Sequence, residues 1–187
     1  MRTIEADFHD QLVSRRWSGR WIGAEPTGPF GSRALFRRTF DVADPRGARL
    51  FISAERDYQL FVNGRFVCRG VPPSPYYYKY YDAVDLAEHL VAGSNCIAVL
   101  VCQIGAPFIG LLADVVDGAG RTLLVTDATW RVTSRTGWAV DNDLDGIHND
   151  SFQEYFKVES HPHGWEQPGF DDAAWDPPHL YPPLGER

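Results

Sequence analysis

The densest group of acidic side chains lies in the segment DNDLDGIHNDSFQE, residues 141–154. Asp141, Asp143 and Asp145, with the glycine that follows, reproduce the opening D-x-D-x-D-G of a calcium loop. In such a loop alternate carboxylates converge on a hard cation, and the glycine allows a sharp turn. A calcium loop also uses a glutamate at its twelfth position, where this chain has Phe152. The segment therefore predicts either a calcium site or an acidic loop that is only solvated.

Aromatic side chains could form a surface that binds sugar. Residues 76–81 contain five tyrosines and one lysine. In an extended strand Tyr77 would share a face with Lys79, and an exposed ring there would suit the C–H face of a pyranose. The alternative is that the tyrosines pack in a core. Trp138 and Trp165 present the same choice, because a tryptophan in a loop of a β-sandwich either stacks against a sugar or plugs the core.

The remaining reactive side chains do not form a recognisable catalytic set. His148, His161 and His163 lack the spacing of a standard zinc site. No serine or cysteine nucleophile with a paired histidine is evident, and the many acidic residues are typical of a solvated surface. The chain has three cysteines, an odd number, and its start lacks the apolar core of a signal peptide. These features predict reduced, buried thiols and a cytoplasmic protein.

Short strands separated by turns would hold these groups in place. In ALFRRTFDV, alternation places Phe36 on one face of a strand and Arg37 on the other. Asn63 and Gly64 predict a type I′ hairpin turn between two such strands, because both turn positions require positive φ. The run CIAVLVCQI, residues 96–104, is apolar on both faces and therefore predicts a strand that is covered on both sides.

Helix is predicted at one place only. The segment DLAEHL, residues 85–90, reads as a short helix with Asp85 as its N-cap. Many short strands, turns rich in Gly, Pro and Asp, and almost no helix are typical of an all-β jelly-roll β-sandwich. We expect a single module over residues 1–187, with a core over about 20–135 and a loop-rich extension, 136–187, that packs on it.

The length, charge and hydropathy of the chain exclude some classes of binding partner. The chain has 187 residues, enough for one well-buried core. Its net charge of −7 argues against a nucleic-acid partner, which would require a basic face. No stretch approaches the roughly 20 apolar residues of a membrane span. We therefore expect neither a nucleic acid nor a membrane as a partner.

Five segments carry a resemblance to a known family. They are YQLFVNGRFVCRG, YYYKYYDAVDLAEHLVAGSNCIAVLV, LLADVVDGAGRTLLVTDATWRVT, QEYF and GWEQPGFDDAAW. The first two also occur in galactose-binding-like jelly rolls attached to glycoside hydrolases. All five in this order, from about Trp21 to Trp175, resemble the N-terminal β-sandwich region of bacterial α-L-rhamnosidases.

The resemblance has implications for catalysis and for binding. It implies that catalysis occurs in a separate α-helical toroid, where a general acid and a general base would lie; this chain lacks such a region. It also implies a sugar site, because some rhamnosidase sandwiches bind L-rhamnose through a calcium ion held by Asp and Asn side chains. Asp141 and Asn142 match those positions. Glu154 matches a family glutamate, although the family's following Tyr-Asp-Ala-Arg is replaced here by residues 156–159, FKVE.

We therefore expect a non-catalytic module of an α-L-rhamnosidase-like glycoside hydrolase that binds or orients rhamnose-containing glycans. The alternative is a purely structural domain that docks on a C-terminal catalytic domain of the parent enzyme. An exposed docking face could also pair with itself in a homodimer. The candidate sugar-binding residues are Asp141, Asn142, Trp138, Glu154, Tyr77 and Trp165, and the candidate calcium ligands are Asp141, Asp143 and Asp145.

Overall fold

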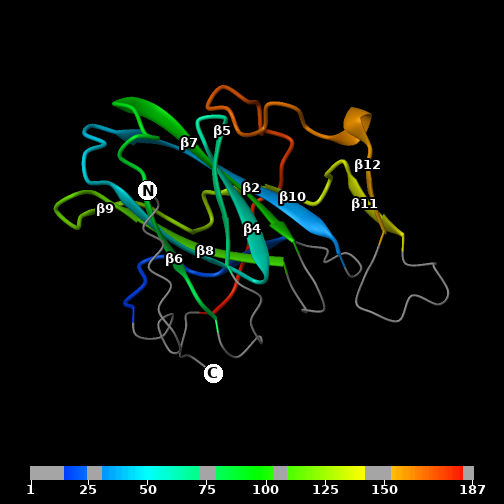
Figure 1. Ribbon diagram of the computed structural model, residues 1–187, viewed down its shortest axis with the longest axis horizontal. Helices are drawn as coiled ribbons and strands as arrows, with labels where there is room; N and C mark the ends of the chain where they lie inside the picture. The colour runs from blue at the N-terminus through cyan, green and yellow to red at the C-terminus, as the bar shows by residue number, and fades with distance from the viewer. Residues whose placement is uncertain (1–14, 25–30, 72–78, 103–108, 142–152, 183–187) are drawn as a thin grey trace.

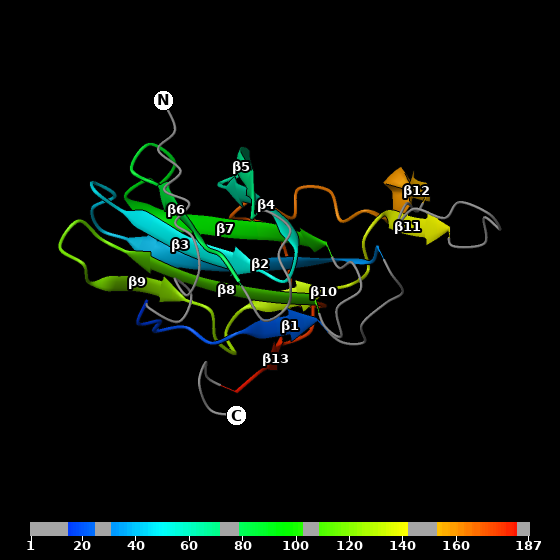
Figure 2. The same cartoon turned by 60° about the horizontal axis from the view of Figure 1, so that its bottom comes forward.

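The structure is a computed structural model that describes residues 15–24, 31–71, 79–102, 109–141 and 153–182. Two antiparallel sheets pack face to face as a β-sandwich, and a separate two-stranded hairpin extends beyond them (Figures 1 and 2). The predicted all-β sandwich is confirmed. Within the described residues, no helix has the length and apolar character needed to cross a membrane.

Sheet A has six strands and sheet B has five. Sheet A follows the order β13-β1-β8-β3-β6, with β9 paired to β8; its strands are β1 (Ile22–Ala24), β3 (Arg49–Ala54), β6 (Asp82–Asp85), β8 (Ile109–Val116), β9 (Thr122–Val125) and β13 (His179–Leu180). Sheet B follows the order β10-β2-β7-β4-β5; its strands are β2 (Arg33–Val42), β4 (Asp57–Val62), β5 (Arg65–Gly70), β7 (Gly93–Cys102) and β10 (Arg131–Thr133).

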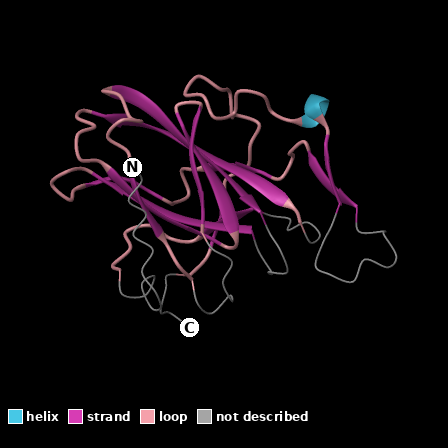
Figure 3. Cartoon of the chain, viewed as in Figure 1, coloured by secondary structure: helices cyan, strands magenta, loops and turns pink. Residues whose placement is uncertain are grey.

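The hairpin outside the sandwich, which we call the arm, consists of β11 (Trp138–Asp141) and β12 (Gln153–Phe156). A single turn of 3₁₀-helix, η1 (Val158–Ser160), follows it and is the one helix in the described part of the chain (Figure 3). The return strand β13 was not anticipated from the sequence. It pairs with β1 and brings the end of the chain back to sheet A.

The central core lies between the two sheets. Fully buried side chains of sheet B, such as Phe36 and Val99, meet those of sheet A, such as Ile52 and Leu111. Trp130 is also fully buried there, and its indole nitrogen donates a hydrogen bond to the Val125 carbonyl at 2.8 Å. Apolar burial at this scale is the main favourable contribution to folding.

The outer face of sheet B is buried as well. Leu35, Cys96, Ala98 and Leu100 form a second cluster beneath Trp165. Strand β7 therefore has no exposed face after Asn95, which explains why residues 96–102 are apolar at every position. The prediction of a strand covered on both sides is confirmed, and the cover comes from the segment that follows the arm.

The Asn63-Gly64 hairpin turn is confirmed, with φ values of 52° and 78°. The Asn63 side chain also ties two loops together, because it accepts a hydrogen bond from the Cys96 amide at 2.8 Å and donates one to Asn95 Oδ1 at 2.8 Å. Asn95 in turn binds the backbone of Val91. The two asparagines thus hold the entry to β7 against the β4–β5 turn.

The helical turn predicted over residues 85–90 is present, but it begins one residue later and extends for one turn only. The chain stays extended through Asp85, because Asp82–Asp85 pairs with β3 as an edge strand of sheet A. Only one turn follows, closed by a hydrogen bond of 3.0 Å from the Leu90 amide to the Leu86 carbonyl. Asp85 still caps that turn through the Ala87 amide at 2.9 Å. Strand pairing therefore overrides the local helical preference at Asp85.

Candidate functional site

The arm carries three of the eight predicted site residues, Trp138, Asp141 and Glu154. Its two strands pair in register from Trp138 opposite Phe156 to Asp141 opposite Gln153. Asp141 is therefore the last residue of β11, and the acidic segment begins where the arm's pairing ends. Only the backbone of Asp141 is described, and the candidates Asn142, Asp143, Asp145 and Tyr77 lie outside the described residues.

A single side chain from sheet B contacts both strands of the arm. Arg33, at the start of β2, forms an ion pair with Glu154 of β12. Its guanidinium carbon also lies 4.2 Å from the centroid of the Trp138 ring on β11. The Arg33 side chain is 11 % exposed and that of Glu154 is 32 % exposed. This contact could not be predicted from the sequence, because Arg33 and Glu154 are 121 residues apart along the chain.

Trp138 is partly buried at the base of the arm. Its ring lies 5.0 Å from that of Phe156 at a tilt of 54°, and the Arg33 guanidinium contacts it as well. It packs against the second cluster of sheet B. These contacts engage the ring with protein groups, so Trp138 serves to join the arm to the sandwich.

Trp165 is 3 % exposed and lies within the second cluster. Its ring packs edge-to-face against Phe61 at 5.6 Å and stacks with Trp175 at 6.3 Å. A buried ring offers no face to a sugar, so its position matches the alternative of a plug over the sheet. Trp175 also packs against the second cluster, after a turn in which its amide donates to the Asp172 carbonyl at 2.9 Å.

Tyr80 and Tyr81, the tyrosines of the run that the structure describes, pack against apolar clusters of the sandwich. Residues 79–81 precede β6 and are not themselves a strand, which corrects that part of the predicted strand. Tyr80 packs against the central core, whereas Tyr81 packs on the outer face of sheet A against Trp17 and Phe51. The predicted alternation of faces is therefore observed for these two residues.

Two buried carboxylates lie at the end of the sandwich near the tyrosine run. Glu55 forms an ion pair with Lys79 at 3.1 Å, and Asp82 accepts a hydrogen bond from the Tyr58 hydroxyl at 2.6 Å. Burial raises the pKa of both carboxyls. Raised pKa values also mark catalytic acids, but each of these groups is paired inside the protein with its own partner. We interpret both as structural contacts.

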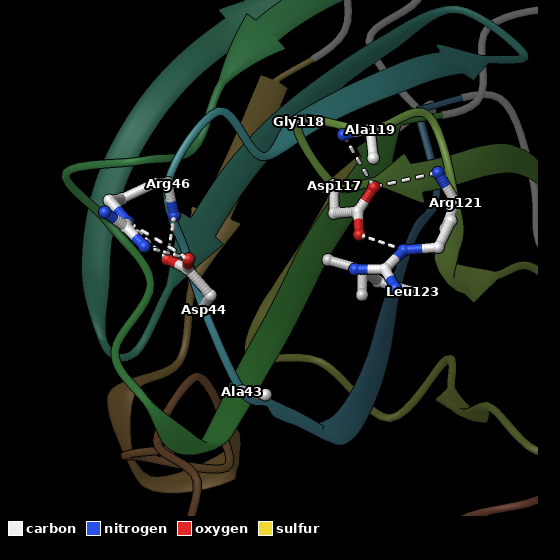
Figure 4. Close-up of a pocket in the computed structure, with 8 residues that line it drawn as sticks. All are labelled: Ala43, Asp44, Arg46, Asp117, Gly118, Ala119, Arg121 and Leu123. Carbon is white, nitrogen blue, oxygen red and sulfur yellow. Dashed lines mark hydrogen bonds and ion pairs between the residues drawn. The ribbon is translucent and has the colours of Figure 1, made fainter.

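An open hollow of about 420 Å³ lies between the 43–46 and 117–121 turns (Figure 4). Two carboxylates line it, and each binds an arginine of its own turn: Asp44 with Arg46, and Asp117 with Arg121. Hydrogen bonds from Arg46 lower the pKa of Asp44 to about 2, and those from the Arg121 backbone and side chain lower that of Asp117. A general acid needs a raised pKa, so these two carboxyls do not form a hydrolytic pair.

Arg37 is a buried charged residue whose role could not be predicted from the sequence. It is 1 % exposed, and the prediction placed it only on the face opposite Phe36. Its guanidinium donates to the carbonyls of Trp165, Gln167 and Phe170 at 2.9, 2.8 and 3.4 Å. It also pairs with the Asp172 carboxylate and lies 3.6 Å from the Cys96 sulfur. The burial of Arg37 could have been inferred from β7, whose outer face is apolar and must therefore be covered. Because β2 pairs with β7, the segment that covers β7 also buries the outer face of β2.

The histidines beyond the arm do not assemble a metal site in the described residues. His163 Nε2 lies 2.7 Å from the Val158 carbonyl, and burial lowers the pKa of His161. No group of three His, Cys, Asp or Glu side chains in the described ranges could hold a metal ion. His148 and the acidic candidates lie outside those ranges.

No protein-family model matches the sequence. Among curated proteins, an α-L-rhamnosidase of Formosa agariphila is 27 % identical over 91 % of this chain and 21 % of its own length. An α-L-rhamnosidase of Streptomyces avermitilis is 25 % identical over 88 % of this chain and 16 % of its own length. The chain thus spans about one fifth of the length of these relatives.

Solved structures give the same result. A GH78 family rhamnosidase of Bacillus sp. GL1 superposes with a TM-score of 0.79 at 32 % identity, covering 92 % of this chain and 19 % of the other. A lectin from Pleurotus ostreatus, solved with GalNAc, has a TM-score of 0.54 at 23 % identity over 88 % of this chain and 42 % of its own, which shows a shared fold alone.

The match to rhamnosidases extends over nearly the whole of this chain but over a small part of each enzyme. The fold is the β-sandwich that the resemblance implied. The predicted resemblance is therefore confirmed: the relatives of this chain are α-L-rhamnosidases, and the chain corresponds to a partial region of GH78 rhamnosidases.

Proposed function

We propose that this chain is a non-catalytic module of an α-L-rhamnosidase-like protein that binds rhamnose-containing glycans at the arm. The observation that carries the proposal is the extent of the match, nearly all of this chain against about one fifth of each rhamnosidase. The hydrolytic chemistry would then belong to other parts of the parent enzyme. The paired carboxylates of the described residues support this division, because each is bound to a partner inside the protein.

We propose that the acidic segment that begins at Asp141, the last residue of β11, binds the sugar through calcium. Its donor set consists of carboxylate and amide oxygens, which are the ligands that Ca²⁺ prefers. Asp141 and Asn142 would provide the first donors, with Asp143 and Asp145 after them. A bound calcium ion would present open coordination positions to sugar hydroxyls.

Calorimetric titration of L-rhamnose into the protein tests the proposal, first with calcium and then with a chelator. We expect heat of binding that depends on calcium and disappears in Asp141→Ala. Asp171→Ala is a matched control, since Asp171 is an exposed aspartate in another turn. Absence of heat at millimolar sugar in the wild type would refute binding. The same protein should not hydrolyse an aryl α-L-rhamnoside, and turnover by the wild-type protein would refute a non-catalytic role.

A structural domain is the second candidate, and exposed apolar side chains of β12 and η1 favour it. Tyr155, Phe156 and Val158 are 47 %, 43 % and 56 % exposed. Tyr155 and Phe156 are consecutive in β12, so apolar side chains are exposed on both faces of the arm. Exposed apolar groups are typical of a surface that another protein segment covers. In this case the isolated chain would self-associate through these side chains. Sedimentation velocity would then show a dimer that Val158→Ser weakens and that the control Val91→Ser, at a second exposed valine, does not.

A further inference from the structure

One side chain of the sandwich is placed to control the position of the arm. Among the described residues, the arm forms its own two-stranded sheet and pairs with no strand of sheet A or sheet B. Its orientation must therefore come from side-chain contacts at its base and from the chain connections. At that base, Arg33 of β2 contacts one side chain on each strand of the arm, Glu154 and Trp138.

The two contacts of Arg33 differ in kind and act together. The ion pair with Glu154 fixes β12, and the contact of the guanidinium with the Trp138 ring at 4.2 Å fixes β11. A planar guanidinium can do both at once, because it stacks on an aromatic ring with its face while its edge donates to a carboxylate. A lysine could provide the charge but not the stacked plane.

The Glu154 carboxylate is therefore already paired with a protein group, the Arg33 guanidinium. Its carboxylate accepts from Arg33, and its cross-strand neighbour is Val140, one position before Asp141. We infer that Arg33 is the positioning residue of the arm, and that Glu154 supports the arm by pairing with Arg33 and not by binding a ligand itself. The first part stands on the contacts alone, whereas the second rests on the proposed function, since it concerns the same binding arm.

Hydrogen–deuterium exchange tests the first part without any ligand. In Arg33→Met we expect the amides of 138–141 and 153–157 to exchange roughly five- to tenfold faster, while those of β7 are unchanged. Arg33→Lys should give an intermediate increase, because it keeps a charge opposite Glu154 but loses the stacked plane. Arg38→Met, the same change on the same strand, is the control. Unchanged exchange of the arm in Arg33→Met would overturn the inference.

Titration of L-rhamnose with calcium tests the second part through a double-mutant cycle. If Glu154 acts through Arg33, Glu154→Gln and Arg33→Met each weaken binding by a similar factor, and the double variant is no weaker than either. If the factors multiply instead, Glu154 contacts the ligand directly and the second part is wrong. Glu159→Gln, an exposed neighbour, should leave the affinity unchanged.

The two proposals fail in different ways. A wild-type protein that binds neither calcium nor L-rhamnose would refute the proposed function, yet the exchange experiment would still decide the role of Arg33. Conversely, a protein that binds the sugar and shows no change in arm exchange on Arg33→Met would keep the proposed function and refute the positioning role. Circular dichroism of each variant verifies that the sandwich is folded.

Discussion

At the scale of single residues, the buried pair of Asp82 and Tyr58 shows how burial sets a charge state. The Tyr58 hydroxyl donates to Asp82 at 2.6 Å, and it lies 4.0 Å from the Cys68 sulfur. Desolvation raises the pKa of Asp82, although the hydrogen bond from Tyr58 acts in the opposite direction. Burial, the Asp82 charge and the hydrogen bond together raise the pKa of Tyr58, which therefore remains a donor.

This shift predicts a pH dependence of stability. The folded protein binds a proton at Asp82 more tightly than the unfolded chain, whose carboxyl has its ordinary pKa of 3.8. Raising the pH from about 4 through the folded pKa therefore removes stability. Asp82→Asn keeps an oxygen acceptor for Tyr58 but cannot ionise, so its free energy of unfolding should fall less between pH 4 and pH 7. Urea denaturation at several pH values measures this difference.

Asp44→Asn is the control for that experiment. The Asp44 carboxyl is exposed, and its pKa is lowered to about 2, so it is ionised in both the folded and the unfolded state above about pH 5. Its replacement should leave the slope of stability against pH unchanged between pH 5 and pH 7. A slope that is identical in wild type and Asp82→Asn would contradict the assignment to Asp82.

At the scale of elements, the segment after the arm is held to sheet B by Arg37. All five N–H groups of its guanidinium have acceptors, and three of these are backbone carbonyls in the 165–170 segment. That segment has little regular structure, so its carbonyls depend on such a donor when they are buried. The apolar contacts of Trp165 and Trp175 add to this polar attachment.

Arg37→Leu should destabilise the protein by about 3 kcal/mol, because it leaves buried carbonyls without donors and Asp172 without its cation. Loosening of the segment should also expose Cys96, which is fully buried in the wild type. We expect its thiol to react with a disulfide reagent within minutes in the variant and to be protected in the wild type. Burial raises the pKa of the Cys96 thiol to about 11, which adds to that protection.

Arg38→Leu provides the comparison, since Arg38 follows Arg37 on the same strand and makes one backbone hydrogen bond, to Thr129 at 3.1 Å. Its loss should cost less than about 1 kcal/mol and should not expose Cys96. Equal costs for the two leucine variants would show that Arg37 does not hold the segment.

The elements themselves were largely predictable from sequence. The Asn63-Gly64 turn and the strands on either side of it follow from the need for positive φ, and the strands β2 and β7 follow from the pattern of their apolar residues. The helical turn predicted over 85–90 starts after Asp85, because residues 82–85 pair with β3, and that contact between distant segments leaves no local pattern. The two-residue strand β13 is too short to leave a pattern of its own.

At the scale of the whole molecule, β2 and β7 belong to two cores at once. Alternate residues of β7 face the central core, as Ile97 and Val99 do, or the outer cluster, as Cys96 and Ala98 do. Neither cluster can be lost without disturbing these two strands, which pair over ten positions. The described sandwich and the segment that covers it therefore form one cooperative unit.

We accordingly expect a single unfolding transition in urea. Far-ultraviolet circular dichroism, which follows the sheets, and tryptophan fluorescence should give coincident curves, because Trp130 lies in the central core and Trp165 in the outer cluster. A Trp165→Phe variant separates the two fluorescence signals and should unfold in one step as well. A fluorescence change that precedes the loss of sheet would indicate that the covering segment unfolds independently.

The sequence by itself determined the class of the fold and the family resemblance, because both depend on local periodicity, turn residues and the order of segments along the chain. It also showed an acidic segment in the last third of the chain. For Trp138 and Trp165 it left two alternatives, a ring that stacks on a sugar or a ring buried over the core. Only the tertiary structure decided that Trp165 is a plug, that Arg37 and Arg33 bind segments more than 100 residues away, and that Glu154 is paired within the protein. These outcomes depend on which distant side chains meet, and spacing along one strand cannot specify that.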